Sequence, residues 1–261
     1  MDERAAMEAA KTIWNLWQAG DVIPHLPEDI RPRCRADGYA AQARLDDLSG
    51  NTCVGWKIAA TSSAGQQHIG VSGPLAGRIF AARVHQPGAT VSIANNRMRV
   101  VEPEFAFRFA RALPARAAPY TTDEVLAAVG SLHLALELPD SRFADFAKVG
   151  EATLIADNAC AHMLVLGDAV GAEWRPLDLS RHAVGAHVAN RYDRQGLGAN
   201  VLGDPRTALT WIANELSALG IGLQAGQFVT TGTCMSPLEV EPGDAVEADF
   251  GVLGRISVRI A

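Results

Sequence analysis

Two carboxylates stand two residues apart in a segment that is typical of a β-strand. In residues 101 to 109, alternate positions fall on opposite faces of an extended chain. One face carries Val101, Pro103, Phe105, Phe107 and Phe109, and the other carries Glu102, Glu104, Ala106 and Arg108. Glu102 and Glu104 therefore point the same way, and each resists burial unless it is paired or neutralised. A bound cation would meet that need directly.

A third carboxylate lies on a similar strand. Within residues 132 to 138 every even-numbered residue is leucine, and the opposite face carries His133, Ala135 and Glu137. Three carboxylates on two strands could form an all-oxygen site for a hard cation, Mg²⁺ or Mn²⁺. The alternative is two half-exposed strands with solvated glutamates, because exposed glutamate is the common case.

A lysine in an apolar strand is the next candidate. Residues 52 to 60 are typical of a strand in which Lys57 lies on the face opposite Trp56 and Ile58. This lysine is either an exposed edge residue or a cation aimed at an anionic ligand or a carboxylate. Thr61-Ser62-Ser63 then predicts the start of a helix that contains His68. A lone histidine is more often structural than catalytic, and His68 is kept as a candidate catalytic group.

The composition restricts the class of protein. The chain has 261 residues, 48% of them apolar, a net charge of −6 and a pI near 5.6. It has no Lys/Arg block, so nucleic-acid binding is not indicated. The cysteines (Cys34, Cys53, Cys160 and Cys234) show no CxxC spacing, which favours a reducing compartment. We see no secretory leader and no membrane-spanning apolar run, and therefore expect a soluble cytoplasmic protein without a membrane partner.

Short strands and a few helices must position these candidates. Helices are predicted over residues 3 to 19, 36 to 48, 121 to 129 and 205 to 219, and further strands over 160 to 166, 182 to 192, 227 to 231, 244 to 250 and 254 to 260. Few helices alternate with strands, and the Gly-x-Gly at 196 to 198 does not open a long helix, so a Rossmann fold is not favoured. The pattern predicts an α+β protein.

Taken in order, several segments resemble the fumarylacetoacetate hydrolase superfamily, and within it the branch of 2-keto-4-pentenoate hydratases and 2-oxo acid decarboxylases. The segments are Gly55-Trp56-Lys57-Ile58-Ala59-Ala60-Thr61-Ser62, Glu102-Pro103-Glu104-Phe105-Ala106-Phe107, Ala135-Leu136-Glu137 with Asp140-Ser141-Arg142, Ala156-Asp157-Asn158-Ala159, residues 205 to 219, Ala225-Gly226-Gln227 and Thr231-Gly232-Thr233. Glu-x-Glu alone is a weak signal, whereas the ordered set is specific.

The resemblance implies a fold and a site. The fold is a mixed β-roll or distorted β-barrel core over residues 71 to 261, preceded by an N-terminal helical part with the first strand over residues 1 to 70. Homo-oligomers built on dimers are implied as well. Glu102, Glu104 and Glu137 would be the ligands of Mg²⁺ or Mn²⁺, and Lys57 would project into the same pocket. The substrate-binding residues would be Thr231, Gly232 and Thr233, which could hold a carboxylate at the floor of the pocket, and Arg142.

The implied activity is that of a hydratase that adds water to a 2-hydroxy-2,4-dienoate and yields a 4-hydroxy-2-oxo acid in aromatic or related catabolism. The same site would serve a 4-oxalocrotonate-type decarboxylase or a C–C hydrolase, and a non-catalytic pathway partner is a further alternative. Hydratases of this branch often carry an acid just before the glycine that matches Gly77. Here Leu75 and Ala76 precede it. Lys57 and His68 are the nearest candidates to replace that acid.

Overall fold

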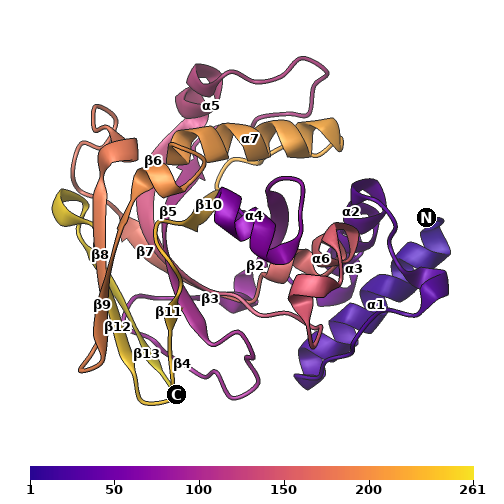
Figure 1. Cartoon of the computed structure of the whole chain (residues 1–261). Helices are drawn as coiled ribbons and strands as arrows, with labels where there is room; N and C mark the ends of the chain where they lie inside the picture. Colours follow the sequence, from indigo (N-terminus) through magenta and orange to yellow (C-terminus); the bar gives the residue numbers. More distant parts are fainter.

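A helical layer formed by the N-terminal residues lies against one side of the molecule. The computed structural model describes all 261 residues, and helix α1 (Glu3–Ala19) runs along the outer edge of this layer (Figure 1). The Asp2 side chain accepts the N–H of Ala5 at 2.7 Å and caps the helix. Gly20 ends it in the left-handed conformation at φ 71°. The predicted helix over residues 3 to 19 is confirmed.

The second predicted helix is interrupted. In place of one helix over residues 36 to 48, the chain forms α2 (Arg35–Ala43) and α3 (Leu45–Ser49). The break falls at Arg44, whose N–H donates to the carbonyl of Ala41 at 3.0 Å, three residues back. This tighter bond replaces the regular four-residue spacing and lets the helix axis turn. Helix α1 packs against both segments.

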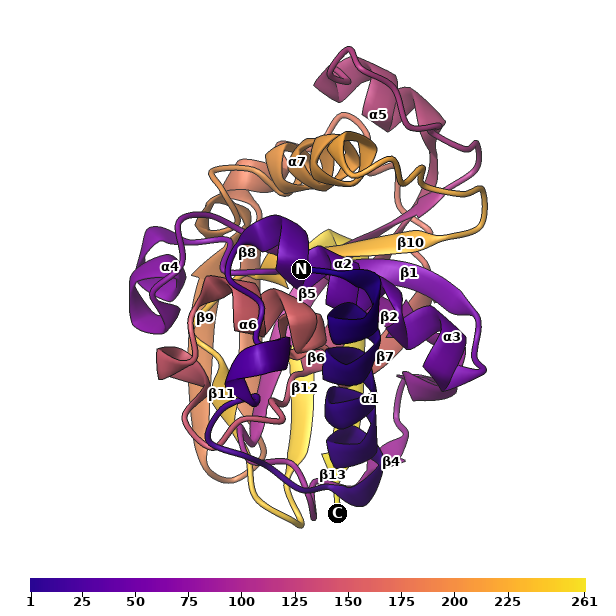
Figure 2. The same cartoon turned by 90° about the vertical axis from the view of Figure 1, so that its right-hand side faces the viewer.

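Two sheets form the rest of the fold (Figures 1 and 2). The larger contains, in spatial order, β2 (Leu75–Phe80), β1 (Cys53–Ala59), β10 (Phe228–Thr233), β5 (Val100–Phe109), β6 (Val129–Leu138), β7 (Met163–Ala169) and β3 (Val84–His85), with β11 (Leu238–Glu239) beside β5. The smaller contains β4 (Thr90–Val91), β13 (Arg255–Ile260), β12 (Ala245–Asp249), β8 (Ala183–Val188) and β9 (Tyr192–Leu197). Parallel and antiparallel pairs are mixed, and the larger sheet curls into a half-barrel, so the predicted α+β class and β-roll are confirmed.

The apolar faces of β5 and β6 build the main core. Both strands alternate as predicted, and their phenylalanines and leucines pack in one buried cluster with residues of the smaller sheet. The rings of Phe105 and Phe250 meet edge to face with centroids 5.2 Å apart. Because these faces point outward to the second sheet, the opposite faces of β5 and β6 are turned into the curl of the larger sheet.

Four further helices complete the fold. They are α4 (Ser63–Ile69), α5 (Thr122–Ala128), α6 (Glu151–Ala156) and α7 (Pro205–Ala218). Thr121 and Glu124 form a capping box at the start of α5, and Asp204 caps α7 ahead of Pro205. The predicted helix starts are thus confirmed where a capping side chain is present.

Two strand predictions are wrong in their bounds. The strand expected over residues 160 to 166 begins only at Met163, because Asn158, Ala159 and Cys160 form a left-handed turn with φ of 55°, 50° and 60°. The strand expected over residues 182 to 192 is β8 followed by the start of β9. The chain reverses between them near Asn190, which has φ 62°.

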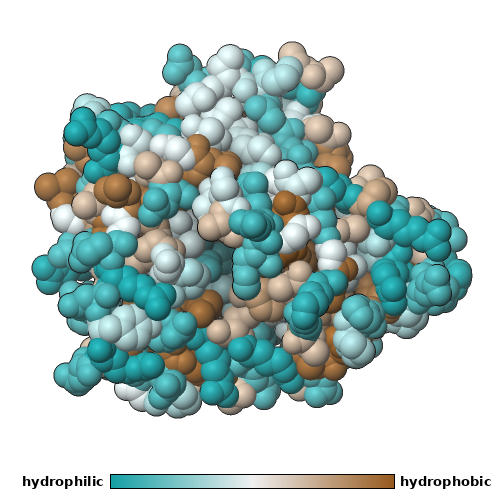
Figure 3. Space-filling model, viewed as in Figure 1, coloured by the Kyte–Doolittle hydropathy of each residue, from teal (hydrophilic) through white to brown (hydrophobic).

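No helix is long and apolar enough to cross a bilayer. In the view of Figure 3, polar and apolar residues are interspersed, and no broad apolar face is visible. In Figure 2, α1 stands in front of the sheets, so the helical layer covers one side of the β-roll.

Candidate metal centre

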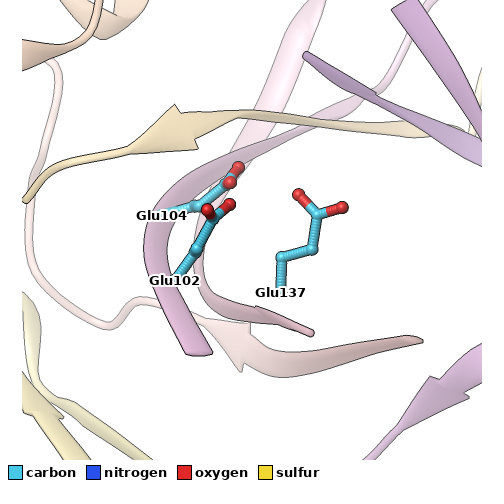
Figure 4. Close-up of side chains that lie close together, drawn as sticks. All are labelled: Glu102, Glu104 and Glu137. Atoms are coloured by element: carbon cyan, nitrogen blue, oxygen red, sulfur yellow. The ribbon is translucent and has the colours of Figure 1, made fainter. Parts of the chain in front are cut away.

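The three glutamates predicted from the sequence meet inside the curl of the larger sheet. Antiparallel pairing of β5 with β6 sets Glu102 directly opposite Glu137, and Glu104 opposite Ala135. One carboxylate oxygen of each glutamate lies within 4.8 Å of those of the other two (Figure 4). Glu104 and Glu137 are buried, and Glu102 is half-buried. A strand register therefore brings together residues that are 35 positions apart in the chain.

These carboxylates are electrostatically strained without a cation. Burial and the charge of Glu137 raise the pKa of Glu102 to about 7. Burial, followed by the charges of Glu137 and Glu102, also raises the pKa of Glu104. Oε1 of Glu104 and Oε2 of Glu137 are buried and have no hydrogen-bond partner. Two buried oxygens without hydrogen-bond partners, in a cluster of three carboxylates, fit a divalent cation with oxygen ligands.

Glu104 is held in place from the neighbouring strand. Its Oε2 accepts the backbone N–H of Gly232 at 2.7 Å. Gly232 has φ 98° and lies in a bulge of β10 where the pairing with β5 shifts. A side chain at this position would collide with Thr61 Oγ1, 2.1 Å from the place of a Cβ. Glycine is therefore required for the N–H to reach the glutamate.

Lys57 reaches the same cluster from β1. Its Nζ lies 2.9 Å from Oε1 of Glu137 and donates to the carbonyl of Ala159 at 3.1 Å. Burial lowers the pKa of this ammonium, but the three glutamates outweigh burial and raise it above its ordinary value. Lys57 is therefore cationic. One lysine cannot balance three carboxylates, which leaves the cluster with an excess of negative charge.

Asn158 holds in place the turn whose Ala159 carbonyl accepts the Lys57 ammonium. Asn158 is fully buried, its Oδ1 accepts the N–H of Arg78 at 2.7 Å, and its Nδ2 donates to the Arg78 carbonyl at 2.8 Å. The side chain thus binds β2 as a further strand would. The Asn158 carbonyl lies only 2.3 Å from where a Cβ on Gly77 would be. Asn158, Ala159 and Gly77 together form the wall beside Lys57.

The missing acid near Gly77 is replaced by apolar packing. Gly77 pairs with Lys57, and the two preceding residues, Leu75 and Ala76, pair with Ala59 and Ile58. Both preceding side chains are buried in the main hydrophobic cluster. This stretch of β2 therefore offers no acid to the centre.

The three substrate-binding residues predicted in β10 lie as follows. The Thr231 hydroxyl donates to the Phe105 carbonyl at 3.1 Å, and the Thr233 hydroxyl donates to the Met235 carbonyl at 2.9 Å. The backbone N–H of Gly232 donates to the Glu104 carboxylate. Sequence reasoning missed Thr230, which is fully buried and whose hydroxyl has no partner. The alternation of side chains in the strand over residues 227 to 231 could have identified Thr230, because it places Thr230 on the face opposite Thr231.

Arg142 and His68 make no ion pair or hydrogen bond with the three glutamates. The Arg142 guanidinium is buried and is paired with the Asp157 carboxylate; it also donates to the backbone carbonyls of Asp140 at 2.9 Å, Ala161 at 3.2 Å and Asp157. It also stacks over Trp17 at 4.5 Å. His68 is exposed in the last turn of α4, beside the ring of Phe146. With these donors engaged, Arg142 supports the loop after β6, and its role in substrate binding stays a prediction.

Residues 68 to 261 match the family model described as fumarylacetoacetate (FAA) hydrolase C-terminal. The chain belongs to the fumarylacetoacetate hydrolase family. It is 33% identical over 255 residues to the 2-keto-4-pentenoate hydratase of Paraburkholderia xenovorans LB400, covering 95% of this chain and 92% of that protein. It is 29% identical over 240 residues to the 4-oxalocrotonate decarboxylase of Pseudomonas sp. CF600, covering 91% and 89%.

Solved structures agree with this family assignment. The 4-oxalocrotonate decarboxylase of Pseudomonas putida G7, complexed with magnesium and adipate, superimposes with a TM-score of 0.89 at 26% identity, covering 100% of this chain and 99% of that chain. The agreement extends over the N-terminal helical layer as well as the sheets. The chain is therefore similar over its length to both hydratases and decarboxylases.

Proposed function

We propose that this protein is a divalent-metal-dependent hydratase that adds water to a 2-hydroxy-2,4-dienoate and yields a 4-hydroxy-2-oxo acid. The observation that carries the proposal is the buried cluster of Glu102, Glu104 and Glu137, with two oxygens left unpaired, in a chain 33% identical to a 2-keto-4-pentenoate hydratase. The reaction class follows from the relatives. The metal-binding role of the glutamates is our proposal from their geometry.

The residues of the cluster would have different roles. Glu102, Glu104 and Glu137 would hold the cation, for which we propose Mg²⁺ or Mn²⁺, because hard cations prefer carboxylate ligands. Such a cation, when bound, withdraws electrons from the oxo group of a 2-oxo acid. Gly232 fixes the orientation of Glu104 through its N–H. Lys57, held by Glu137 and the Ala159 carbonyl, presents a positive charge to an anionic substrate.

Water addition needs a defined proton balance. The dienol first tautomerises to an α,β-unsaturated 2-oxo acid; the oxygen of water then bonds to C4, and one hydrogen of that water ends on C3. Lys57 is cationic and paired with Glu137, so it would attract and orient the anionic substrate and would not act as a base. A carboxylate base from β2 is excluded, since Leu75 and Ala76 are apolar.

A decarboxylase of the 4-oxalocrotonate type is the second candidate function. Two observations favour it: the apolar stretch before Gly77, and the close superposition with a 4-oxalocrotonate decarboxylase. A C–C hydrolase of the same family would use the same carboxylates. A non-catalytic role is disfavoured by the three glutamates that remain beside Lys57. Burying these carboxylates costs folding free energy, and nothing in the fold requires anionic side chains there.

We further propose a cytoplasmic location and a homo-oligomer built on dimers. All four cysteines are unpaired, which is typical of a reducing compartment. The oligomer follows from the resemblance described above, and light scattering on the purified protein tests it.

The hydratase proposal is tested with two substrates in the presence of Mg²⁺. We expect loss of the dienoate absorbance of 2-hydroxypenta-2,4-dienoate and formation of a 4-hydroxy-2-oxo acid. Release of CO₂ from 2-oxohex-3-enedioate without hydration of the dienoate would instead assign the protein to the decarboxylases. Glu239→Gln, which alters an exposed carboxylate of β11, is a matched control for variants of the cluster.

A further inference from the structure

Two neighbouring buried threonines of β10 differ in their hydrogen bonding. Thr231 donates its hydroxyl to the Phe105 carbonyl at 3.1 Å. Thr230 is equally buried, yet its hydroxyl has no partner in the protein. A buried hydroxyl without a partner costs folding free energy, and a valine of the same shape would avoid that cost. The Thr230 hydroxyl therefore calls for a partner outside the chain.

The register of the sheet places this hydroxyl beside the metal centre. Thr230 pairs with Lys57 of β1 on one side and with Ala106 of β5 on the other. Directly paired residues of neighbouring strands project from the same face. Ala106 shares its face with Glu104, two positions earlier in β5. Thr230, Lys57 and Glu104 therefore face into the same curl.

The same row contains Gly77, the residue that follows the position where the acid is missing. Lys57 pairs with Gly77 of β2 as well as with Thr230, so the three residues lie side by side across three strands. The acid often found just before this glycine is absent, and Lys57 is engaged by Glu137 and Ala159. Thr230 thus supplies an uncommitted polar group to this row.

We propose that the Thr230 hydroxyl binds the water molecule that adds to the substrate. The inference rests on the proposed hydratase function. The hydroxyl is buried and has no partner in the chain, and water is the smallest polar molecule of the reaction that could reach it. A buried water needs two to four polar partners, and the ammonium of Lys57, which lies beside Thr230 in the same row, keeps one N–H beyond its bonds to Glu137 and Ala159. In the addition, the oxygen of this water bonds to C4, and one of its hydrogens ends on C3.

The test uses Thr230→Val, with Thr231→Val as the matched control and Thr230→Ser as the rescue variant. Urea unfolding is measured on metal-free protein, and kcat and KM for dienoate hydration on the Mg²⁺-loaded enzyme. We expect Thr230→Val to unfold at the same or a higher urea concentration than wild type, because it removes an unpaired hydroxyl. Thr231→Val should unfold earlier, because it removes a hydrogen bond and leaves the Phe105 carbonyl unpaired.

Activity separates a water-binding role from a structural one. We expect Thr230→Val to lower kcat by roughly tenfold or more with little change in KM, and Thr230→Ser to restore it. An unchanged kcat, a change confined to KM, or an unfolding midpoint that falls as in Thr231→Val would overturn the inference. Failure of wild type to hydrate any dienoate would contradict the hydratase function itself, whereas the unfolding comparison would still report whether Thr230 is unpaired.

Discussion

Oε1 of Glu137 lies 2.9 Å from Nζ of Lys57, and both side chains are only 3% exposed. The other oxygen of Glu137, Oε2, is buried and has no hydrogen-bond partner. The ion pair ties β1 to β6 across two intervening strands. It also fixes the one lysine of the centre without consuming the oxygen that a cation would need.

Lys57→Met should separate the ion pair from the metal site. The substitution leaves Glu137 buried without its partner, so the free energy of unfolding of metal-free protein should fall by about 3–5 kcal/mol. Mg²⁺ affinity should be kept, because no carboxylate is lost, while turnover should fall by about a hundredfold or more. Urea unfolding, calorimetric Mg²⁺ titration and the hydration assay measure the three effects. Turnover at the wild-type level would make Lys57 a purely structural residue.

The metal-free centre should respond to pH near neutrality. Burial and Glu137 raise the pKa of Glu102 from 4.5 to about 7. A carboxyl group whose pKa is raised on folding stabilises the folded state below its unfolded pKa, and this contribution is lost as the pH rises through the folded pKa. Metal-free protein should therefore lose stability between pH 4.5 and 7. Mg²⁺ affinity should rise over the same interval, because the cation displaces the proton.

The pH experiment compares wild type with Glu102→Gln. Urea unfolding in the presence of a chelator should show a shallower loss of stability in the variant, because one titrating group is gone and Glu104, whose pKa is also raised, remains. An equal pH dependence in both proteins would show that Glu102 titrates in its ordinary range.

The sequence predicted the centre better than its surroundings. Alternation in the strands predicted that Glu102 and Glu104 share a face, and a local pattern suffices for this because the period of a strand is two. The pairing of Glu102 with Glu137 depends on the register of β5 against β6, which the sequence does not state. The left-handed turn at Ala159 was not predictable either, because its conformation comes from bonds that Asn158 makes with β2.

Gly77→Ala should disturb the wall beside Lys57. A Cβ at Gly77 would lie 2.3 Å from the Asn158 carbonyl, whereas a Cβ at Gly73 meets nothing within 4 Å. Overpacking of this kind should lower the free energy of unfolding by about 1–3 kcal/mol and should reduce turnover by moving the lysine's acceptor. Gly73→Ala is the control and should behave as wild type. Equal stability and activity in both variants would show that the turn at Asn158 can move without lowering the free energy of unfolding.

Arg142→Met should report on stability rather than on substrate binding. The guanidinium is buried against Asp157, so its removal leaves that carboxylate unpaired and should lower the free energy of unfolding by about 3–5 kcal/mol. The exposed Arg255 is the control, and Arg255→Met should change stability by about 0.5 kcal/mol or less. Unchanged stability together with a raised KM would instead restore the substrate-binding role expected from the sequence.

The most direct test of the account is a calorimetric titration of metal-free protein with Mg²⁺, made on wild type, Glu104→Gln and the control Glu239→Gln. We expect one saturable site in wild type and in the control. In Glu104→Gln, which loses an anionic ligand but keeps its shape, affinity should fall by at least about a hundredfold, while urea unfolding shows that the fold is kept. Equal Mg²⁺ affinity in wild type and Glu104→Gln would contradict the assignment of the three glutamates as the metal centre.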